Sequence, residues 1–468
     1  MGHKLEKKYG LLTAMCMVIG IVIGSGVFFK AETILTATGG HLLTAIAAWT
    51  VGGLIMIACA YTFSIMATKY EKVNGIVDYA EATMGKTYAY ILAWFITFMY
   101  YPTVATVVAW VCARYTCVLV GIPDITGGAA MLLTGMYLCL SYGLNALSPK
   151  LAGKFQVATT IIKLIPIVLM VILGIYTGIK SGVLVHNFSQ TPSIEEILSV
   201  KPNYVPVKNP FLTALVSASF AFEGWIIATS INSEIKDSKR NLPIALIGGT
   251  LIISIVYILY YVGLAGAADN LTMIAGGETG AKIAFTNILG PFGAIMLMVC
   301  IIISCMGTLN GYMLASVRGM YFIAVRNEGP NPKLFSNVDS ATGMPTNSAI
   351  VGLIVCILWL VYFYGAKLAP ESWFGPVVFD PSEITIITLY AMYIPIFVRM
   401  IKMEKDLNVF NRFIMPVLAI AGSTFMVIAA AISNGTKVVI LYLIIFAVIT
   451  VIGMLLKKPK NSNQIEEI

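Results

Sequence analysis

Two apolar stretches of this chain are interrupted in the middle, at places about 200 residues apart. The first is interrupted at Gly24-Ser25-Gly26 and the second at Glu223-Gly224. Glycine lets a membrane helix leave helical geometry, which frees amide and carbonyl groups that lipid cannot satisfy. Such backbone is tolerated only against protein or a water-filled site. Paired interruptions in the two halves of a chain therefore indicate a solute site at the bilayer midplane.

The chemistry of such paired breaks suits a molecule that carries both a carboxylate and an ammonium group. Amides freed at Gly24, Ser25 and Gly26 start a second half-helix, whose positive dipole end attracts a carboxylate. Carbonyls exposed at the end of the first half-helix and around 220–225 can accept from an ammonium. Close packing of small residues is the alternative, but the spacing of two and the mirrored break favour a site. The predicted binding residues are Ile23, Gly24, Ser25, Gly26, Phe220, Ala221, Phe222, Glu223 and Gly224.

Glu223 is a carboxylate deep in an apolar span, where a charge costs about 2.5–3.5 kcal/mol on insertion scales. Residues of this kind usually serve function. Three roles are open for Glu223: pairing with a cationic side chain of the solute, carrying a proton, or pairing with a cation of the protein.

Lys163 is the second charged residue that we expect inside the membrane. It lies nine residues after Lys154, roughly 13 Å deeper at the helical rise, and a snorkelling lysine belongs nearer the interface. The interpretation that we favour is a fixed internal cation that bonds the loose carbonyls of the broken first helix.

Other polar or bulky residues in the spans carry weaker signals. Arg114 and Arg318 lie near predicted span ends. Each of them could extend its side chain to the membrane surface (snorkelling) or form an ion pair at a gate of the transport route, and the sequence favours neither explanation. Tyr100-Tyr101-Pro102 marks a bend in the third span, where packing is the favoured explanation. Phe220 is expected to act as a lid, since an aromatic beside an unwound segment can cover a solute.

Composition identifies an integral membrane protein, because 58% of the 468 residues are hydrophobic and only 11% are charged. Twelve apolar segments are long enough to span, and those from 88 and 291 exceed one bilayer thickness. The predicted spans are 11–36, 42–68, 88–118, 126–147, 153–178, 211–233, 243–267, 291–326, 345–363, 382–400, 412–433 and 436–456.

Lysine and arginine placement predicts that both termini are cytoplasmic. Roughly twenty of these residues fall in the inside loops and tails and six outside. The net charge of +8 is explained by this bias and indicates no nucleic-acid partner. The polar leader is too short for a cleavable presequence. The eight cysteines lie in predicted spans without metal-site spacing, so we expect free thiols and no cofactor or metal.

Spans one to five and six to ten begin on opposite sides, and a broken helix leads each set, which is typical of inverted repeats. The expected organisation is a cytoplasmic segment at 1–10, repeats at 11–178 and 211–400, an extended or partly ordered extracellular loop at 179–210, two appended helices at 401–456 and a cytoplasmic tail at 457–468. A short interfacial helix is expected within 268–290.

Three motifs together resemble the amino acid–polyamine–organocation superfamily, and within it the L-type amino acid transporter branch, as a bacterial member. They are Ile23-Gly24-Ser25-Gly26-Val27-Phe28, Phe220-Ala221-Phe222-Glu223-Gly224-Trp225 and Asn232-Ser233-Glu234-Ile235-Lys236-Asp237-Ser238-Lys239-Arg240-Asn241-Leu242-Pro243. The resemblance implies an all-α membrane protein of twelve helices, with a LeuT-type five-plus-five inverted repeat and two C-terminal helices.

The resemblance also implies roles for single residues. Gly24, Ser25 and Gly26 would bind the substrate carboxylate, and Phe220 would be the gating aromatic. Lys163 matches a fifth-span lysine that replaces a sodium site. An acidic residue at Glu223 tilts the substrate toward basic amino acids.

Two departures from the family pattern bear on partners and gating. The segment 121–127 has no cysteine where animal members link a glycoprotein subunit, so a covalent subunit is not expected; Cys117 is the nearest candidate. Lys30-Ala31-Glu32 also stands where a proline is common.

The function that we expect is a sodium-independent amino acid exchanger that works by alternating access, for basic or small neutral amino acids, in the cell membrane. A proton-coupled symporter is the alternative within the same class, with Glu223 or Lys163 titrating. A membrane sensor of amino acids is the alternative from another class. An enzyme is not expected, because the histidines lie at predicted ends or loops and no catalytic constellation is present.

Overall fold

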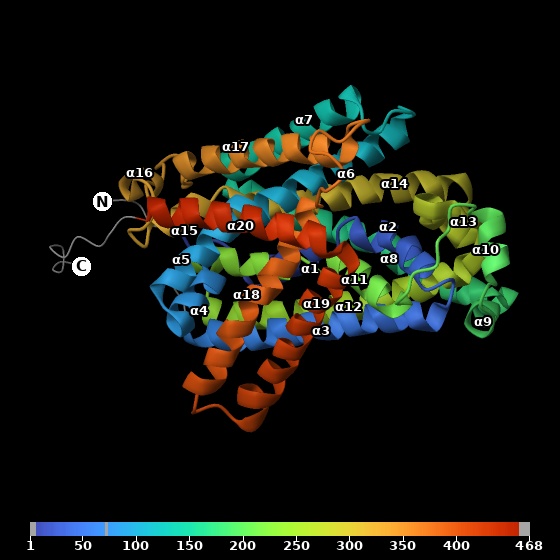
Figure 1. The fold of residues 1–468 in the computed structure, drawn as a ribbon, viewed down its shortest axis with the longest axis horizontal. Coiled ribbons are helices and arrows are strands. Elements are labelled where there is room, and N and C mark those ends of the chain that lie inside the picture. The colour runs from blue at the N-terminus through green and yellow to red at the C-terminus, as the bar shows by residue number, and fades with distance from the viewer. Residues whose placement is uncertain (1–5, 71–73, 458–468) are drawn as a thin grey trace.

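The computed structural model describes residues 6–70 and 74–457, and within them the chain is built from helices (Figure 1). The long helices are α1 (Leu11–Val22), α2 (Gly26–Ala37), α3 (Leu42–Lys69), α5 (Lys86–Phe95), α6 (Tyr101–Val120), α7 (Gly128–Leu147), α8 (Pro149–Ser181), α11 (Pro210–Ala221), α12 (Ser238–Ala267), α14 (Gly280–Ser316), α17 (Thr346–Phe363), α18 (Pro381–Met403), α19 (Met415–Asn434) and α20 (Thr436–Leu456). Shorter α-helices are α4 (Gly75–Met84), α9 (Val183–Ser189), α10 (Ile194–Val200), α13 (Asn270–Gly276), α15 (Gly319–Ala324) and α16 (Pro332–Phe335). There are also two 3-10 segments, η2 (Trp225–Glu234) and η3 (Gly277–Thr279). Three segments are π-helical: η1 (Ile96–Tyr100), η4 (Tyr364–Leu368) and η5 (Phe410–Ile414).

Eleven helices in the described part of the chain are long and apolar enough to cross a membrane. The remaining predicted span is divided between α1 and α2, which are 12 residues each. A 12-residue helix is about 18 Å long, so it takes both halves to cross a hydrocarbon core of about 30 Å. The all-helical, twelve-span class predicted from the sequence is confirmed.

Several predicted boundaries differ from the structure. The span expected at 291 begins at Gly280, because α14 continues through a bend at Gly290, where φ is 66°. The expected interfacial helix is α13. The loop at 179–210, predicted as extended or partly ordered, contains the short helices α9 and α10. A reciprocal capping box between Ser193 and Glu196 starts α10, and the hydrogen bond from the Ser193 amide lowers the pKa of the Glu196 carboxyl.

Most of the helices lie roughly parallel to one long axis, with α15 and α16 at one end and α9, α10 and α13 at the other, while α18 and α19 slant away from this axis (Figure 1). Helix α12 packs against α3 and α8, α14 packs against α6 and α8, and α1 packs against all of α8, α12 and α14. The broken first helix is therefore enclosed by protein on several sides, which is the condition for unwound backbone at membrane depth.

Helices α8 and α12 cross with their backbones nearly in contact. A Cβ atom built on Gly174 would lie 2.2 Å from the Gly263 carbonyl oxygen, and one built on Gly178 would lie 2.4 Å from Gly266 Cα. Because the opposing atoms belong to backbone, no side chain can rotate away to make room. The crossing depends on small residues from both helices, as in other close membrane-helix contacts.

Gly174→Ala is therefore expected to destabilise the protein by about 1–3 kcal/mol, the usual cost of overpacking, despite the better helix propensity of alanine. Thermal unfolding in detergent measures the effect. Gly135→Ala on α7 is the matched control, because nothing lies within 4 Å of its Cβ position. Equal unfolding temperatures for both variants would contradict the tight crossing.

Candidate substrate site at the two helix breaks

The first break ends α1 with carbonyl groups that have no partner in their own helix, and side chains of other helices satisfy them. Lys163 Nζ donates to the carbonyls of Gly20 and Ile23, at 2.7 and 2.6 Å. The Thr308 hydroxyl donates to Ile21 at 2.9 Å, and the Ser304 hydroxyl donates to Ile23 at 3.0 Å. The end of α1 is thus held in place from α8 and α14.

One tyrosine joins the two breaks. The Tyr257 hydroxyl on α12 lies 2.8 Å from the Val22 carbonyl oxygen, at the end of α1, and 3.0 Å from the Ala221 carbonyl oxygen, at the end of α11. Its single hydrogen is within reach of both acceptors. The breaks also touch directly, since a Cβ on Gly26 would lie 2.9 Å from Ala221 Cα. Nothing in the sequence pattern had pointed to Tyr257.

The second break follows Ala221 and turns the chain from α11 into η2. Gly224 takes a φ of 108°, a left-handed conformation that favours glycine. Phe222 is buried and packs edge-on against Trp49, with ring centroids 5.6 Å apart. Its ring therefore faces α3 and the protein interior.

A small cavity lies between the breaks, with a volume of about 20 Å³, room for about one water molecule. Six of the nine predicted binding residues line it: Gly24, Ser25, Gly26, Phe220, Ala221 and Glu223. Ile23, Phe222 and Gly224 are not among the lining residues. Val104, Val108, Thr308, Tyr312 and Ile386 line it without having been singled out from the sequence.

Glu223 is 4% exposed and faces this cavity. Its Oε1 atom accepts a hydrogen bond from the Tyr100 hydroxyl, and its Oε2 atom has no hydrogen-bond partner among the described residues. No cation of the described chain forms an ion pair with Glu223, so pairing with the protein's own lysines or arginines does not account for it. Packing alone was the favoured explanation for Tyr100; its hydroxyl instead orients the carboxylate.

Lys163 lies behind the first break and does not line the cavity. Besides the two α1 carbonyls, its ammonium group donates to the Ser304 carbonyl at 3.1 Å. Three carbonyl oxygens thus surround one buried cation.

The sequence profile of the amino acid permease family matches residues 9–458. The chain belongs to this family. Over 428 residues it is 27% identical to the serine/threonine exchanger SteT of Bacillus subtilis, covering 90% of each chain. It is 24% identical to the human large neutral amino acids transporter small subunit 2, covering 82% of this chain and 74% of the relative.

The solved structure of MhsT with L-phenylalanine shares the fold, with a TM-score of 0.56 at 15% identity, and the match covers 91% of this chain and all of that one. The fold is thus the LeuT-type fold that the sequence predicts. The chain is a multi-pass membrane transporter and not an enzyme.

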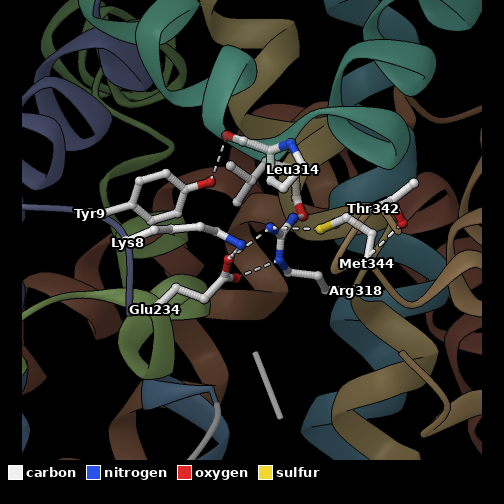
Figure 2. Close-up of polar contacts among 8 residues, drawn as sticks. Lys8, Tyr9, Glu234, Leu314, Arg318, Thr342 and Met344 are labelled. Carbon is white, nitrogen blue, oxygen red and sulfur yellow. Dashed lines mark hydrogen bonds and ion pairs between the residues drawn. The ribbon is translucent and has the colours of Figure 1, made fainter. Parts of the chain in front are cut away.

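A buried ion cluster lies directly before α15 of the permease (Figure 2). Arg318 and Glu234 are fully buried, and Arg318 Nε lies 2.7 Å from Glu234 Oε1. Lys8 Nζ lies 2.6 Å from the other carboxylate oxygen. Of the two explanations for Arg318, snorkelling is therefore wrong. Arg318 forms a buried ion pair, which was the other explanation.

The segment before α1 is fastened to the same cluster. The amides of Lys8 and Tyr9 both donate to the Glu234 carbonyl, and the Lys236 amide donates to the Tyr9 carbonyl. The Tyr9 hydroxyl donates to the Pro149 carbonyl at 3.0 Å, and burial raises the pKa of this hydroxyl, so it stays protonated as a donor. The cluster thus links the start of α1 to η2, α8 and α14.

At the opposite end, Phe220 separates the small cavity from a second one of about 120 Å³. The Lys30 ammonium lies 5.2 Å from the centroid of the Phe220 ring, a cation–π contact. Arg114 also lines this outer cavity and stacks over Trp110, 5.5 Å from its ring centroid. Phe220 thus lies between the two cavities and lines both of them.

The cysteines are free thiols, all buried except Cys139. No group of three or more potential metal ligands occurs within 6–70 and 74–457.

Arg318→Met is expected to lower stability by about 3–5 kcal/mol, because it strands a buried Glu234 carboxylate beside a single lysine. Lys8→Met should cost less, since Arg318 remains as the partner. Thermal unfolding in detergent compares them with Arg240→Met, an exposed control on α12. If Arg318→Met unfolds at the same temperature as that control, the cluster does not stabilise the closed end.

Lys163→Ala is expected to leave folded protein in the membrane but to slow transport at least tenfold. Each lost charge-assisted hydrogen bond is worth about 1.5–3 kcal/mol, and the end of α1 would lose its fixed position. Transport by reconstituted protein measures this, with Lys154→Ala, exposed on the same helix, as the control. Equal rates for the two variants would remove Lys163 from the mechanism.

Proposed function

We propose that this permease is a sodium-independent amino acid exchanger that works by alternating access. The observation that carries the proposal is the buried Lys163 ammonium, bonded to the carbonyls of Gly20, Ile23 and Ser304. A fixed protein cation at this point makes a bound sodium ion unnecessary for holding the broken helix. The names of relatives, which include a serine/threonine exchanger, support amino acids as substrates and exchange as the mode.

In this proposal, the substrate binds between the two breaks through its backbone groups. The first amides of α2, at Gly26 and Val27, have no acceptor within their helix and lie at the positive end of its dipole, which suits a carboxylate. The free oxygen of Glu223 is the acceptor for a donor on the substrate, either a cationic side chain or a hydroxyl. Phe220 closes the site on the outer side.

Alternating access follows from the two unequal ends. The ion cluster of Lys8, Glu234 and Arg318 blocks one route, and Phe220 lies between the site and the outer cavity. Because Lys163, Tyr257 and Thr308 attach the end of α1 to α8, α12 and α14, a substrate that shifts the break also moves these contacts. The positive-inside bias supports a cytoplasmic location for the ion cluster and the termini.

Proton-coupled symport is the second candidate, and one observation favours it: a buried carboxylate with a single hydrogen-bond partner can take up a proton. Uptake into empty vesicles that grows with an inward proton gradient would support symport and overturn exchange.

The test uses purified protein in liposomes loaded with one amino acid, in sodium-free buffer, with labelled arginine, serine, alanine or leucine outside. Uptake is expected only when the lumen is loaded, and sodium should leave the rate unchanged. A sodium requirement, or equal uptake into empty vesicles, would contradict the proposal.

Glu223→Gln tests the role of the carboxylate in the same assay. Loss of a buried charge pair costs about 2–5 kcal/mol, so arginine transport should fall at least tenfold more than alanine transport if Glu223 holds a cationic side chain. Tyr100→Phe is the matched control, because it keeps the charge and removes only the hydroxyl. Equal losses for arginine and alanine in Glu223→Gln would point to a proton-carrying or structural role.

A further inference from the structure

The short helix α15 has an arginine at each end. Arg318 directly precedes it, and Arg326 follows shortly after its last residue, Ala324. The two arginines bind different elements of the permease. Arg318 donates to both carboxylate oxygens of Glu234 in η2, at 2.7 and 3.2 Å. Arg326 forms an ion pair with Asp78 of α4. One six-residue helix thus connects η2 and α4 through charged contacts at its two ends.

The contact between Arg326 and α4 is well shielded from water. The Asp78 side chain is 1% exposed and that of Arg326 is 11% exposed. Arg326 Nε also lies 3.5 Å from Glu81 Oε2, and its Nη1 donates to the Phe322 carbonyl of α15 at 2.5 Å. Two carboxylates of α4 thus share one guanidinium that α15 orients. Loss of one partner from such a pair leaves a buried charge uncompensated.

Helix α15 is supported by the rest of the fold, because it packs against η1, α5 and α17. The Tyr321 amide donates to the Ser348 hydroxyl of α17 at 3.0 Å. A Cβ atom built on Gly319 would lie 2.5 Å from Thr97 Cγ2 of η1, so the start of α15 lies closely on that segment. The two arginines therefore flank a helix whose position is fixed.

Helix α4 and η2 pack directly against each other, and we call this interface the seam. A Cβ atom built on Gly75 of α4 would lie 2.8 Å from Thr229 Cβ of η2. No hydrogen bond or ion pair links the described residues of α4 to those of η2. The polar contacts of α4 lead instead to Arg326 and to Arg399 of α18, which donates to the Thr83 carbonyl at 3.1 Å.

Buried polar atoms without partners lie around the seam. The Phe63 ring of α3 packs against three aromatic rings there. They belong to Trp225 of η2, Tyr79 of α4 and Tyr393 of α18, with centroids 6.1, 5.7 and 4.9 Å from that of Phe63. The indole nitrogen of Trp225 and both tyrosine hydroxyls have no hydrogen-bond partner among the described residues. Since burying such atoms costs free energy, the closed seam depends on contacts elsewhere.

We propose that α15 is a strap whose two arginines hold η2 against α4, and that the transport route toward the ion cluster opens along the seam when these contacts break. The seam begins at the substrate site, because η2 follows directly after Gly224 of the second break, and η2 ends at Glu234 of the ion cluster. Ten residues of 3-10 helix span about 20 Å. An amino acid that passes along the seam meets the unpartnered polar atoms of Trp225, Tyr79 and Tyr393.

Thiol labelling at the seam tests the strap. Thr229→Cys places a thiol of similar size at a position of η2 that is 0% exposed. Purified protein in detergent is treated with a charged, water-soluble maleimide, and the labelling rate above that of the native cysteines is measured. Adding Arg326→Gln is expected to raise this rate at least about tenfold, because the strap loses one of its charge-assisted contacts. Lys333→Gln, exposed on α16, is the matched control and should leave the rate unchanged.

Further variants distinguish a strap from a salt bridge that only stabilises the fold. Thr134→Cys on α7 is also 0% exposed, and its labelling should not change with Arg326→Gln. Asp78→Asn should accelerate labelling of Thr229→Cys, and its combination with Arg326→Gln should add little, since contacting partners are not additive. Arg326→Lys keeps the charge but loses the planar fork, so it should give a smaller increase and carries the test if Arg326→Gln does not fold.

Two results would overturn the strap. One is an unchanged labelling rate of Thr229→Cys in folded Arg326→Gln and Arg326→Lys. The other is equal acceleration at Thr229→Cys and Thr134→Cys, which would mean general loosening of the fold. The strap rests on the alternating access proposed above, but labelling in detergent requires no transport. A permease that exchanges amino acids while its seam stays unlabelled in these variants would therefore contradict the strap and leave the proposed function standing.

Discussion

A membrane helix that stops halfway across the bilayer leaves carbonyl oxygens that neither lipid nor its own backbone can satisfy. In this protein the carbonyls from Gly20 to Ile23 all receive donors from elsewhere: Lys163 of α8, Tyr257 of α12, and Thr308 and Ser304 of α14. Without these donors the carbonyls at the end of α1 would be unsatisfied, and a break at this point would be unfavourable. The cavity exists because α1 ends there, and the amides of α2 are free because the chain restarts three residues later.

The same donors connect the site to the rest of the molecule. They come from three helices that surround α1, so a displacement of the break changes the contacts of all three helices together. Tyr257 has the widest reach, because its hydroxyl touches the ends of both broken helices. A two-state movement of the whole assembly is more compatible with this arrangement than independent motion of either break, since close-packed interiors do not deform continuously.

Charge inside the membrane is distributed in two different ways. The Arg318–Glu234 pair is satisfied on all sides and lies between helices that meet at one end of the molecule. Glu223 has one partner and faces a cavity. A buried charge that has an ion-pair partner carries a modest net cost in free energy. A buried carboxylate oxygen without a hydrogen-bond partner is costly unless another group donates to it. This difference in pairing distinguishes the ion cluster from the cavity at the two breaks.

The sequence by itself determined that the protein is an all-helical membrane protein, where its spans lie, where the two breaks lie and that Glu223 and Lys163 are buried charges. These follow from local composition, because apolar length, glycine and an intramembrane charge leave their mark on neighbouring residues. Six predicted residues line the cavity for the same reason: they are the break itself. Only the tertiary structure decided which side chains complete it. Tyr257, Thr308 and Tyr100 look like ordinary span residues, and Phe222 looks like its neighbour Phe220 although it faces the interior. Their roles depend on where helices more than a hundred residues apart cross, and the order of residues within one helix does not encode the angle at which another helix meets it.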